Sequence, residues 1–443
     1  MSDQTITTAS PERLHESEHE RSITIPKDAS FWKRMLAFAG PAFLISVGYM
    51  DPGNWATDIE GGSKFRYQLL WVILASNMIA LLLQTLSVRL GIVTGQDLAQ
   101  ACRTHFKRPV VLMLWFFAEI AIGACDLAEL LGSAVALNLL FHIPLLAGVL
   151  ITSLDVLILL ALQSRGMRMI EALIVTLVAT VAGCYFFEIM IAKPDWGGVG
   201  RGLIQPHLNK ESLYIALAIL GATVMPHNLY LHSSLVKSRK VDRTPEGIKS
   251  ALKFNFIETF VALNGAFFVN AAILIMAAAV FFERGIVVDE LQKAHQTLGH
   301  LFSTGVASAV FAIALLAAGQ SSTITGTMAG QVVMEGFLQW KIAPWARRLV
   351  TRLIAIIPAV VVIAMNSSGG AARQNHAVFQ LLILSQAVLS VQLSFATIPL
   401  ALFTGDKKRM GEFVNPLWVK ILTWVVVLGI AGLNIILLKN SFK

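Results

Sequence analysis

The chain has 443 residues, of which 56% are hydrophobic and only 14% are charged. Soluble proteins carry roughly 25% charged residues, so this composition excludes an ordinary soluble enzyme. The net charge of +8 fits the basic cytoplasmic loops of a membrane protein better than it fits nucleic-acid binding. The three cysteines form no CxxC pair, so they predict neither a disulfide framework nor a zinc site.

Apolar runs of about 20 residues recur along the chain, and each is long enough to cross a hydrocarbon core about 30 Å thick. They predict an all-α polytopic membrane protein with about eleven transmembrane helices. The predicted spans are 34–60, 68–93, 109–140, 143–162, 168–192, 212–237, 254–282, 302–327, 348–366, 376–403 and 415–437. The short segment from Glu335 to Trp340 is expected to extend the eighth span or to lie at the membrane interface.

Residues 1–31 are polar and charged and contain no apolar segment of the kind found in a signal peptide. We expect a disordered cytoplasmic tail here, followed by a transmembrane domain over residues 32–443. Basic residues concentrate in alternate loops, while the other loops include acids such as Asp195 and Asp289. This asymmetry predicts a multi-pass protein of the inner (plasma) membrane with a cytoplasmic N-terminus and a C-terminus outside.

Two predicted spans are interrupted by proline. The first contains Asp51-Pro52-Gly53-Asn54 and the sixth contains Met225-Pro226-His227-Asn228. Each proline alone could produce an ordinary helix kink, but an ionisable Asp51 inside a membrane is costly. Interrupted spans at matching positions of two five-span halves are typical of an inverted-repeat transporter with its binding site at mid-membrane. The halves would cover 32–193 and 210–404, with an eleventh helix at 413–438.

The residues at these two breaks offer a mixed set of metal ligands. Asp51 has a carboxylate, Asn54 an amide oxygen and Met225 a thioether. Unwound backbone also frees carbonyl groups near Gly48 and Ala222. Mg²⁺ and Ca²⁺ prefer cages of oxygen alone, whereas softer divalent ions accept sulfur. The set therefore favours a transition metal, although Met225 could also simply fill a gap in the core.

Three acids, Glu119, Asp126 and Glu129, occupy one stripe of the third span. At about 100° per residue they fall within a quarter of the helix circumference. Buried acids need partners or protons, so the stripe forms a proton path, a structural set of salt bridges, or both. The candidate basic partners are Arg239, Arg347, Arg348 and Arg352.

Three further polar features lie inside the predicted spans. His227 follows Pro226 directly and could carry protons because histidine titrates in the useful pH range, although a buried histidine more often serves as a hydrogen-bonding group. The small and hydroxylated residues 319–327 of the eighth span favour close helix packing. Gln386 of the tenth span is a weaker candidate for a metal ligand.

From about Ala37 onward the chain resembles the natural resistance-associated macrophage protein (Nramp) family of divalent-metal transporters, including its bacterial manganese transporters. The resemblance lies in Asp51-Pro52-Gly53-Asn54, Met225-Pro226-His227, Asp126-Leu127-Ala128-Glu129, residues 319–326, Ser385-Gln386 and Gln392-Leu393. It implies a LeuT-type fold with two inverted five-helix repeats and broken helices 1 and 6, and symport of Mn²⁺ or Fe²⁺ with protons. It also implies that the metal is held by Asp51, Asn54, Met225 and the carbonyl groups of Gly48 and Ala222, and in occluded states by Gln386.

The same resemblance implies that His227, Glu119, Asp126 and Glu129 belong to a proton path, with Arg239, Arg347 and Arg348 as basic partners. The chain departs from the family at Lys64 and Arg66, where small residues are expected, and at Ser394, which replaces an expected proline. Two cations near the outer mouth could weaken the capture of cations at low salt.

The sequence thus predicts a proton-coupled symporter that imports Mn²⁺, Fe²⁺ and Cd²⁺ into the cytoplasm. In this prediction Asp51 is both a metal ligand and the first proton acceptor. It predicts no enzymatic activity, no cofactor and no obligate protein partner; the partners are the metal ion, protons and the bilayer. The alternative is a magnesium or broad divalent-cation transporter or channel of the same fold without proton coupling. A sodium-coupled amino-acid symporter is disfavoured, because Asp51 would repel the carboxylate of its substrate.

Overall fold

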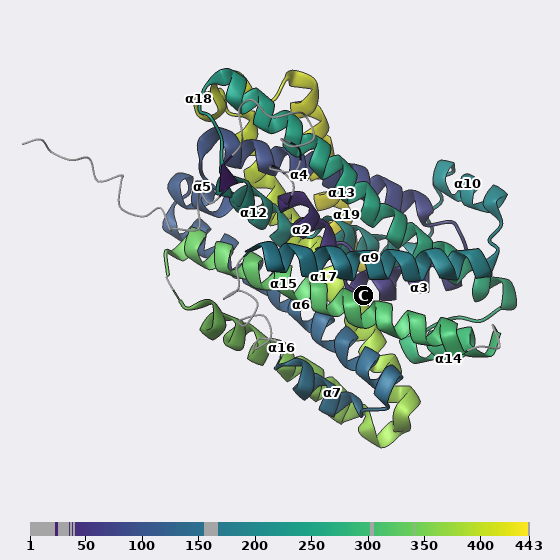
Figure 1. The fold of residues 1–443 in the computed structure, drawn as a ribbon. Coiled ribbons are helices and arrows are strands. Elements are labelled where there is room, and N and C mark those ends of the chain that lie inside the picture. Colours follow the sequence, from purple (N-terminus) through teal and green to yellow (C-terminus); the bar gives the residue numbers. More distant parts are fainter. Residues whose placement is uncertain are drawn as a thin grey trace, which may run out of the picture.

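The computed structural model of the chain describes residues 23–24, 35, 38, 40–154, 167–301, 305–340 and 342–441, and these are almost entirely helical (Figure 1). The first half contains α2 (Pro41–Gly48), α3 (Pro52–Phe65), α4 (Leu70–Thr94), α5 (Leu98–His105), α6 (Arg108–Phe141), α7 (Leu145–Thr152), α9 (Met167–Ala192) and α10 (Trp196–Ile204). The second half contains α11 (Lys210–Val224), α12 (Pro226–Leu235), η3 (Val236–Ser238), α13 (Pro245–Val280), η4 (Phe282–Arg284), α14 (Leu291–Leu301), α15 (Gly305–Leu338), α16 (Pro344–Asn366), η5 (Ser367–Gly369), α17 (Gly370–Gly405), α18 (Lys407–Met410), η6 (Gly411–Phe413) and α19 (Leu417–Ser441).

Two short strands, β1 (Ile23–Thr24) and β2 (Arg239–Lys240), pair in parallel, with Ile23 opposite Arg239. The structure therefore differs from the predicted disordered tail at two residues, whose backbone groups pair with the segment after α12. Both are β-branched, which favours a strand. The remainder of the predicted tail, residues 1–22 and 25–31, lies outside the described residues.

Seven helical stretches among the described residues are long and apolar enough to cross a membrane, and an eighth counts if the bent pair Thr176–Ala192 and Trp196–Ile204 forms one span. One of the seven, Ala346–Gly405, contains both the ninth and the tenth predicted spans. The first predicted span is divided between α2 and α3, and part of the fourth lies outside the described residues. The class of multi-pass helical membrane protein is confirmed, and the total of eleven spans stays a prediction.

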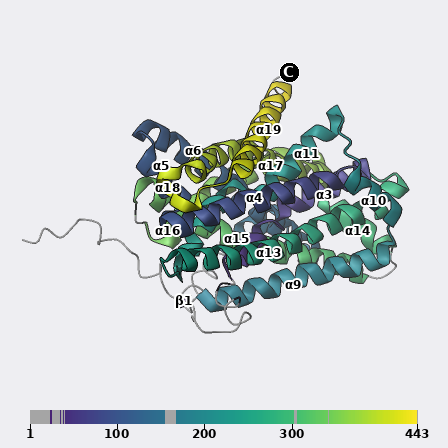
Figure 2. The same ribbon diagram turned by 90° about the horizontal axis from the view of Figure 1, so that it is seen from above.

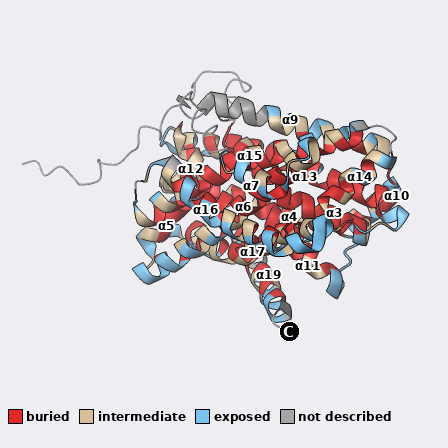
Figure 3. Ribbon diagram, turned by 90° about the horizontal axis from the view of Figure 1, so that it is seen from below, coloured by how far each residue is buried: buried red, intermediate tan, exposed pale blue. Residues whose placement is uncertain are grey.

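The bundle has central and peripheral helices. In the apolar window of Lys210–Ser238, 89% of the residues are buried, against 28% in Leu417–Lys439. The sixth span therefore lies inside the bundle, whereas α19 projects from it in Figure 2. Figure 3 shows buried residues concentrated on the inner helices and exposed ones on the outer faces. Large apolar side chains on these outer faces, such as Phe186 and Phe268, are positioned to contact lipid.

The long helix α6 connects the centre of the bundle to its periphery. It packs against α3 on one side and against α15, α16 and α17 on others. Helix α15 continues to Leu338, so the segment from Glu335 extends the eighth span, as one of the two predicted alternatives states. The position of α6 places its acidic stripe between the first break and the arginines of α16.

Candidate metal centre

Both interrupted spans break at the predicted positions. Helix α2 ends at Gly48 and α3 begins at Pro52, while α11 ends at Val224 and α12 begins at Pro226. Each proline occupies the first position of a half-helix, where its missing N–H removes no intrahelical hydrogen bond. Met225, between α11 and α12, has a φ of 43°, a left-handed conformation that is uncommon outside glycine. A non-glycine residue keeps such a conformation only where the surrounding structure imposes it, so the packing around Met225 holds the two half-helices apart at this residue.

Asp51 caps the first turn of α3. Its Oδ1 atom accepts hydrogen bonds from the backbone N–H of Asn54 at 2.8 Å and from Asn54 Nδ2 at 2.9 Å. Its Oδ2 atom is buried and has no hydrogen-bond partner among the described residues. A buried carboxylate oxygen without a partner is costly, so the fold leaves one acidic oxygen available to a cation.

Amide side chains link the two breaks. Asn54 Nδ2 donates to the carbonyl oxygen of Ala222 at 3.1 Å. Asn270 of α13 donates through Nδ2 to the carbonyl oxygen of Tyr49 at 2.8 Å and to Asn54 Oδ1 at 3.5 Å. The predicted freed carbonyl of Ala222 therefore faces the first break, while that of Gly48 accepts a hydrogen bond from the backbone N–H of Asp51.

The thioether of Met225 lies against the end of α2. A Cβ atom added at Gly48 would lie 3.1 Å from Met225 Sδ and 2.7 Å from Asn228 Nδ2. Asn228 Nδ2 also lies 3.6 Å from Met225 Sδ, and Asn228 Oδ1 has no partner among the described residues. Glycine at position 48 thus allows the sulfur and a second amide to approach the first break closely.

Gln386 of α17 completes the surroundings of the break. A Cβ atom added at Gly53 would lie 1.7 Å from Gln386 Nε2, so the carboxamide occupies the space above Gly53. Its Nε2 donates to Ser385 Oγ at 2.9 Å, and its buried Oε1 has no hydrogen-bond partner among the described residues. The structure therefore brings this weaker candidate ligand to the first break.

The chemistry of this donor set distinguishes it from a zinc or iron site of the usual kind. No group of three or more His, Cys, Asp or Glu side chains that could hold a metal occurs in the part of the chain that the structure describes. The buried donors are instead one carboxylate, neutral amides, backbone carbonyls and one thioether. Such a set can hold a divalent ion of intermediate softness.

The acids of α6 pair with the arginines of α16. Arg348 Nη1 lies 2.7 Å from Asp126 Oδ1, and Arg347 Nη2 lies 3.0 Å from Glu119 Oε2. Glu129 Oε2 is 3.6 Å from Arg348 Nη2 and 3.9 Å from Arg352 Nη2. The predicted salt bridges are thus present. The proton path is compatible with them and stays a prediction.

The hydroxyl groups of α15 also bind Glu129. Ser322 Oγ donates to Glu129 Oε1 at 2.9 Å and Thr323 Oγ1 donates to Glu129 Oε2 at 3.0 Å. A Cβ atom added at Gly326 would lie 3.0 Å from Glu129 Oε1. The polar cluster of the eighth span therefore allows close packing, as expected, and in addition solvates a buried acid.

Close packing brings the acidic stripe to the first break. A Cβ atom added at Gly132 of α6 would lie 2.1 Å from Pro52 Cβ, so the two helices touch there. Glu129, one turn earlier, is close enough to Asp51 for their charges to interact. His227 is buried, neither ring nitrogen has a hydrogen-bond partner among the described residues, and its charge would interact with Asp126.

Arg239 lies in β2, where Nη1 donates to Ser238 Oγ at 3.2 Å and its charge acts on Glu258 of α13. Its predicted pairing with the acids of α6 stays a prediction. Glu258 Oε1 accepts hydrogen bonds from the backbone N–H groups of Gly40 and Ala42 at 2.7 and 3.0 Å. A buried carboxylate at a helix N-terminus complements the helix dipole, so this contact anchors the start of α2.

The two unexpected cations at the end of α3, Lys64 and Arg66, are paired with acids. Lys64 forms an ion pair with Glu60, one turn earlier on α3. Arg66 Nη2 lies 2.6 Å from Glu283 Oε1 and 3.5 Å from Asp195 Oδ2. Each of the two cations thus lies beside a carboxylate, and the expected weaker capture of cations stays a prediction.

Three residues that contribute to these contacts were not predicted as site residues. Asn228, Asn270 and Glu258 are all buried, and each stands in an otherwise apolar or proline-broken helix. An amide or acid at membrane depth is itself a signal of function or of a structural partner. Applying that rule to every span would have identified all three.

The chain matches known proteins over nearly its whole length. The family model described as natural resistance-associated macrophage protein-like matches residues 42–440. A protein of Nostoc sp. named divalent metal cation transporter MntH is 56% identical over 428 residues, covering 96% of this chain and 95% of the relative. A protein of the same name from Listeria monocytogenes is 53% identical over 426 residues, covering 95% and 94%.

Solved structures show the same relationship. The manganese transporter of Eremococcus coleocola matches with a TM-score of 0.88 at 41% identity, covering 95% of this chain and 90% of that one. Mhp1, a nucleobase-cation-symport-1 family transporter, matches with a TM-score of 0.58 at 17% identity, covering 86% and 78%. The second match concerns the fold alone and confirms the predicted LeuT-type fold class.

Proposed function

Because the chain belongs to the natural resistance-associated macrophage protein family, we propose that it is a proton-coupled symporter that imports Mn²⁺, Fe²⁺ and Cd²⁺. The relatives carry the names of divalent metal cation transporters and not of enzymes. The observation that carries the proposal is Asp51 Oδ2, which is buried where two broken helices meet and has no hydrogen-bond partner among the described residues. No cofactor is required, because the metal is the cargo.

In this proposal the metal ion binds between the two breaks. The ligands are Asp51, Asn54, Met225, the carbonyl groups of Gly48 and Ala222, and Gln386 when the site closes. Asn54 now directs Nδ2 toward Asp51 and Ala222, so a rotation of its amide group would present Oδ1 to the ion. The thioether favours softer ions over Mg²⁺ and Ca²⁺.

The acids of α6 provide the proposed exit for protons. A dication beside Asp51 favours its ionised form, so an arriving metal releases a proton there. Glu129 is the neighbouring carboxylate, and its hydrogen bonds to Ser322 and Thr323 hold it in place. From Glu129 the stripe continues to Asp126 and Glu119, while Arg347, Arg348 and Arg352 stabilise its ionised members. His227 is a further proton carrier in this proposal.

The same proposal includes the orientation of the protein in the inner (plasma) membrane. The distribution of basic residues among the loops supports an N-terminus in the cytoplasm and a C-terminus outside. With this orientation α2 and α12 face the cytoplasm, and the outer mouth carries the ion pairs of Lys64 and Arg66. Metal and protons both enter the cell, and no protein partner is required.

Reconstituted vesicles test the proposal. Mn²⁺ added outside vesicles that contain the full chain and a trapped pH indicator should enter and acidify the lumen. Asp51→Asn should abolish both signals, whereas Lys408→Gln, an exposed change on α18, should leave both unchanged. Metal entry without acidification would support the passive alternative, and a folded protein that moves no metal would contradict the proposal.

A further inference from the structure

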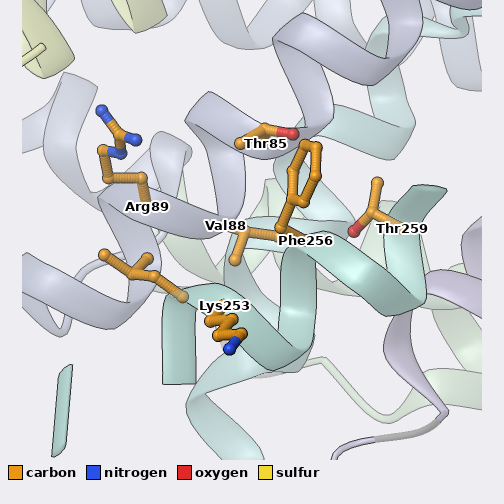
Figure 4. A pocket seen from close by; sticks show the side chains of 7 residues that line it. Thr85, Val88, Arg89, Lys253, Phe256 and Thr259 are labelled. Atoms are coloured by element: carbon orange, nitrogen blue, oxygen red, sulfur yellow. The ribbon is translucent and has the colours of Figure 1, made fainter. Parts of the chain in front are cut away.

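A cavity of about 250 Å³ lies between α4 and α13, away from the metal centre. It is lined by Thr85, Val88, Arg89, Leu252, Lys253, Phe256 and Thr259, and Figure 4 shows six of these side chains labelled on the two helices. Arg89 lies five residues before the end of α4, and Lys253 lies eight residues after the start of α13. Lys253 directly precedes the predicted span 254–282, and Arg89 lies four residues before the end of the predicted span 68–93. At 1.5 Å per residue both are within about 6 Å of a span end, beside the interfacial layer that holds the lipid headgroups.

The charge of the cavity is uniformly positive. Its lining, within the described part of the chain, contains two cations and no carboxylate. Arg89 Nη1 donates to Asn415 Oδ1 at 2.8 Å, and Asn415 is held in turn by Thr404. Arg89 Nε is buried and has no hydrogen-bond partner among the described residues. The Arg89 guanidinium group is therefore oriented by a neutral side chain, which leaves its positive charge available to an anion.

Glu258 of α13 is a buried acid that does not line the cavity. Glu258 neighbours Thr259 in the sequence, but its Oε1 is bound to the backbone N–H groups of Gly40 and Ala42 at the start of α2. Glu258 therefore caps the start of α2 and does not line the cavity.

The surface beside the cavity is apolar. Phe256 and Phe260 lie one turn apart on α13, are 45% and 47% exposed, and have ring centroids 6.4 Å apart. Both follow Lys253 along α13, so they lie farther than Lys253 from the start of that helix. The arrangement of a cationic cavity at headgroup depth followed by exposed aromatic rings fits a lipid with an anionic headgroup.

We propose that this cavity binds the phosphate group of an anionic phospholipid, with Arg89 and Lys253 as its cationic contacts and the acyl chains along Phe256 and Phe260. The basic end of a transmembrane groove is the environment in which anionic headgroups bind. The inference concerns a lipid site and does not depend on which metal is transported or on proton coupling.

Native mass spectrometry of the purified full chain tests this site. The protein is equilibrated with equal amounts of phosphatidylglycerol and phosphatidylcholine that have the same acyl chains. We expect preferential retention of phosphatidylglycerol. The preference should fall about fivefold in Lys253→Gln and about 30-fold in the double variant Arg89→Gln with Lys253→Gln. The matched control, Lys407→Gln with Lys408→Gln, removes two cations from α18 and should keep the preference.

Three outcomes would overturn the proposal. Equal retention of the two lipids by the wild type would show that the protein has no site selective for the anionic headgroup. An equal loss of preference in the cavity and α18 variants would indicate diffuse surface charge. Displacement of the lipid by inorganic phosphate, with retention of phosphate alone, would indicate a small-anion site. Thermal unfolding in detergent checks that each variant is folded. If the double variant does not fold, Lys253→Gln alone tests the site, because Lys253 is exposed.

Discussion

Asn54 Nδ2 donates to the carbonyl oxygen of Ala222 at 3.1 Å, and this hydrogen bond joins the two interrupted spans at their breaks. The same amide donates to Asp51 Oδ1 at 2.9 Å. Asn54 therefore fixes the position of the carboxylate relative to the freed carbonyl group before a metal arrives. Because this amide must rotate before its Oδ1 atom can bind a metal, the hydrogen bond to Ala222 belongs to the metal-free state, in which it holds the two breaks together.

Replacement of this amide should damage both the fold and the site. Asn54→Ala leaves Asp51 and Ala222 without their shared partner, which should lower the free energy of unfolding by about 1–3 kcal/mol and abolish Mn²⁺ uptake. Thermal unfolding in detergent and uptake into vesicles measure the two effects. Asn264→Ala, on α13 and outside both breaks, is the control. Uptake by Asn54→Ala at the rate of this control would show that the bridge is dispensable.

The thioether of Met225 should determine which ions are accepted. Met225→Ala removes the soft ligand, so Cd²⁺ should bind more weakly while Ca²⁺ or Mg²⁺, which prefer oxygen, should gain access. Isothermal titration with each ion measures the change. Continued exclusion of Ca²⁺ by a folded Met225→Ala protein would mean that another group controls selectivity.

The contact between α6 and the first break predicts that alanine will destabilise the protein at Gly132 but not at Gly123 of the same helix. Gly132→Ala places a Cβ atom 2.1 Å from Pro52 Cβ, and overpacking of this kind costs about 1–3 kcal/mol. Gly123→Ala is the matched control, since a Cβ atom there meets nothing within 4 Å, and alanine in a helix stabilises it by about 0.5–1 kcal/mol relative to glycine. Equal unfolding temperatures for the two variants would contradict the packing described here.

Metal binding should weaken as pH falls. A carboxylate binds the ion only when it is deprotonated, so protons and metal compete for Asp51. If one proton is displaced, the apparent affinity for Mn²⁺ should fall by up to about tenfold per pH unit on the acidic side. Asp51→Asn should bind weakly and lose this dependence, while Glu119→Gln should keep it. A pH dependence that survives in Asp51→Asn would assign the proton release to a different group.

Much of the fold follows from local features of the sequence. The length of each apolar run predicts a helix because unpaired backbone groups cannot remain in lipid. Pro52 and Pro226 mark the breaks together with their polar neighbours Asp51 and His227. Pro358 and Pro399 have apolar neighbours and lie inside the continuous helices α16 and α17, so a proline alone does not predict a break. The stripe of Glu119, Asp126 and Glu129 is predicted because residues at these offsets share a helix face, and their arginine partners were found on α16.

Contacts between helices that are far apart in the sequence could not be predicted from it. Nothing local indicates that Gln386 fills the space above Gly53, or that Asn270 reaches Tyr49 from a helix more than 200 residues away. Such contacts depend on the relative position of whole helices, which a periodicity of 3.6 residues does not encode. The two residues of β1 were missed for the same reason, since their pairing with β2 is also long-range.

The location of the bound ion is the most direct test of the central claim. Crystals of the protein grown with Mn²⁺ would give an anomalous-scattering peak that identifies the metal position without reference to activity. The account predicts a peak within bonding distance of both a carboxylate oxygen of Asp51 and the sulfur of Met225. A peak elsewhere in the bundle, with these two side chains uncoordinated, would contradict it.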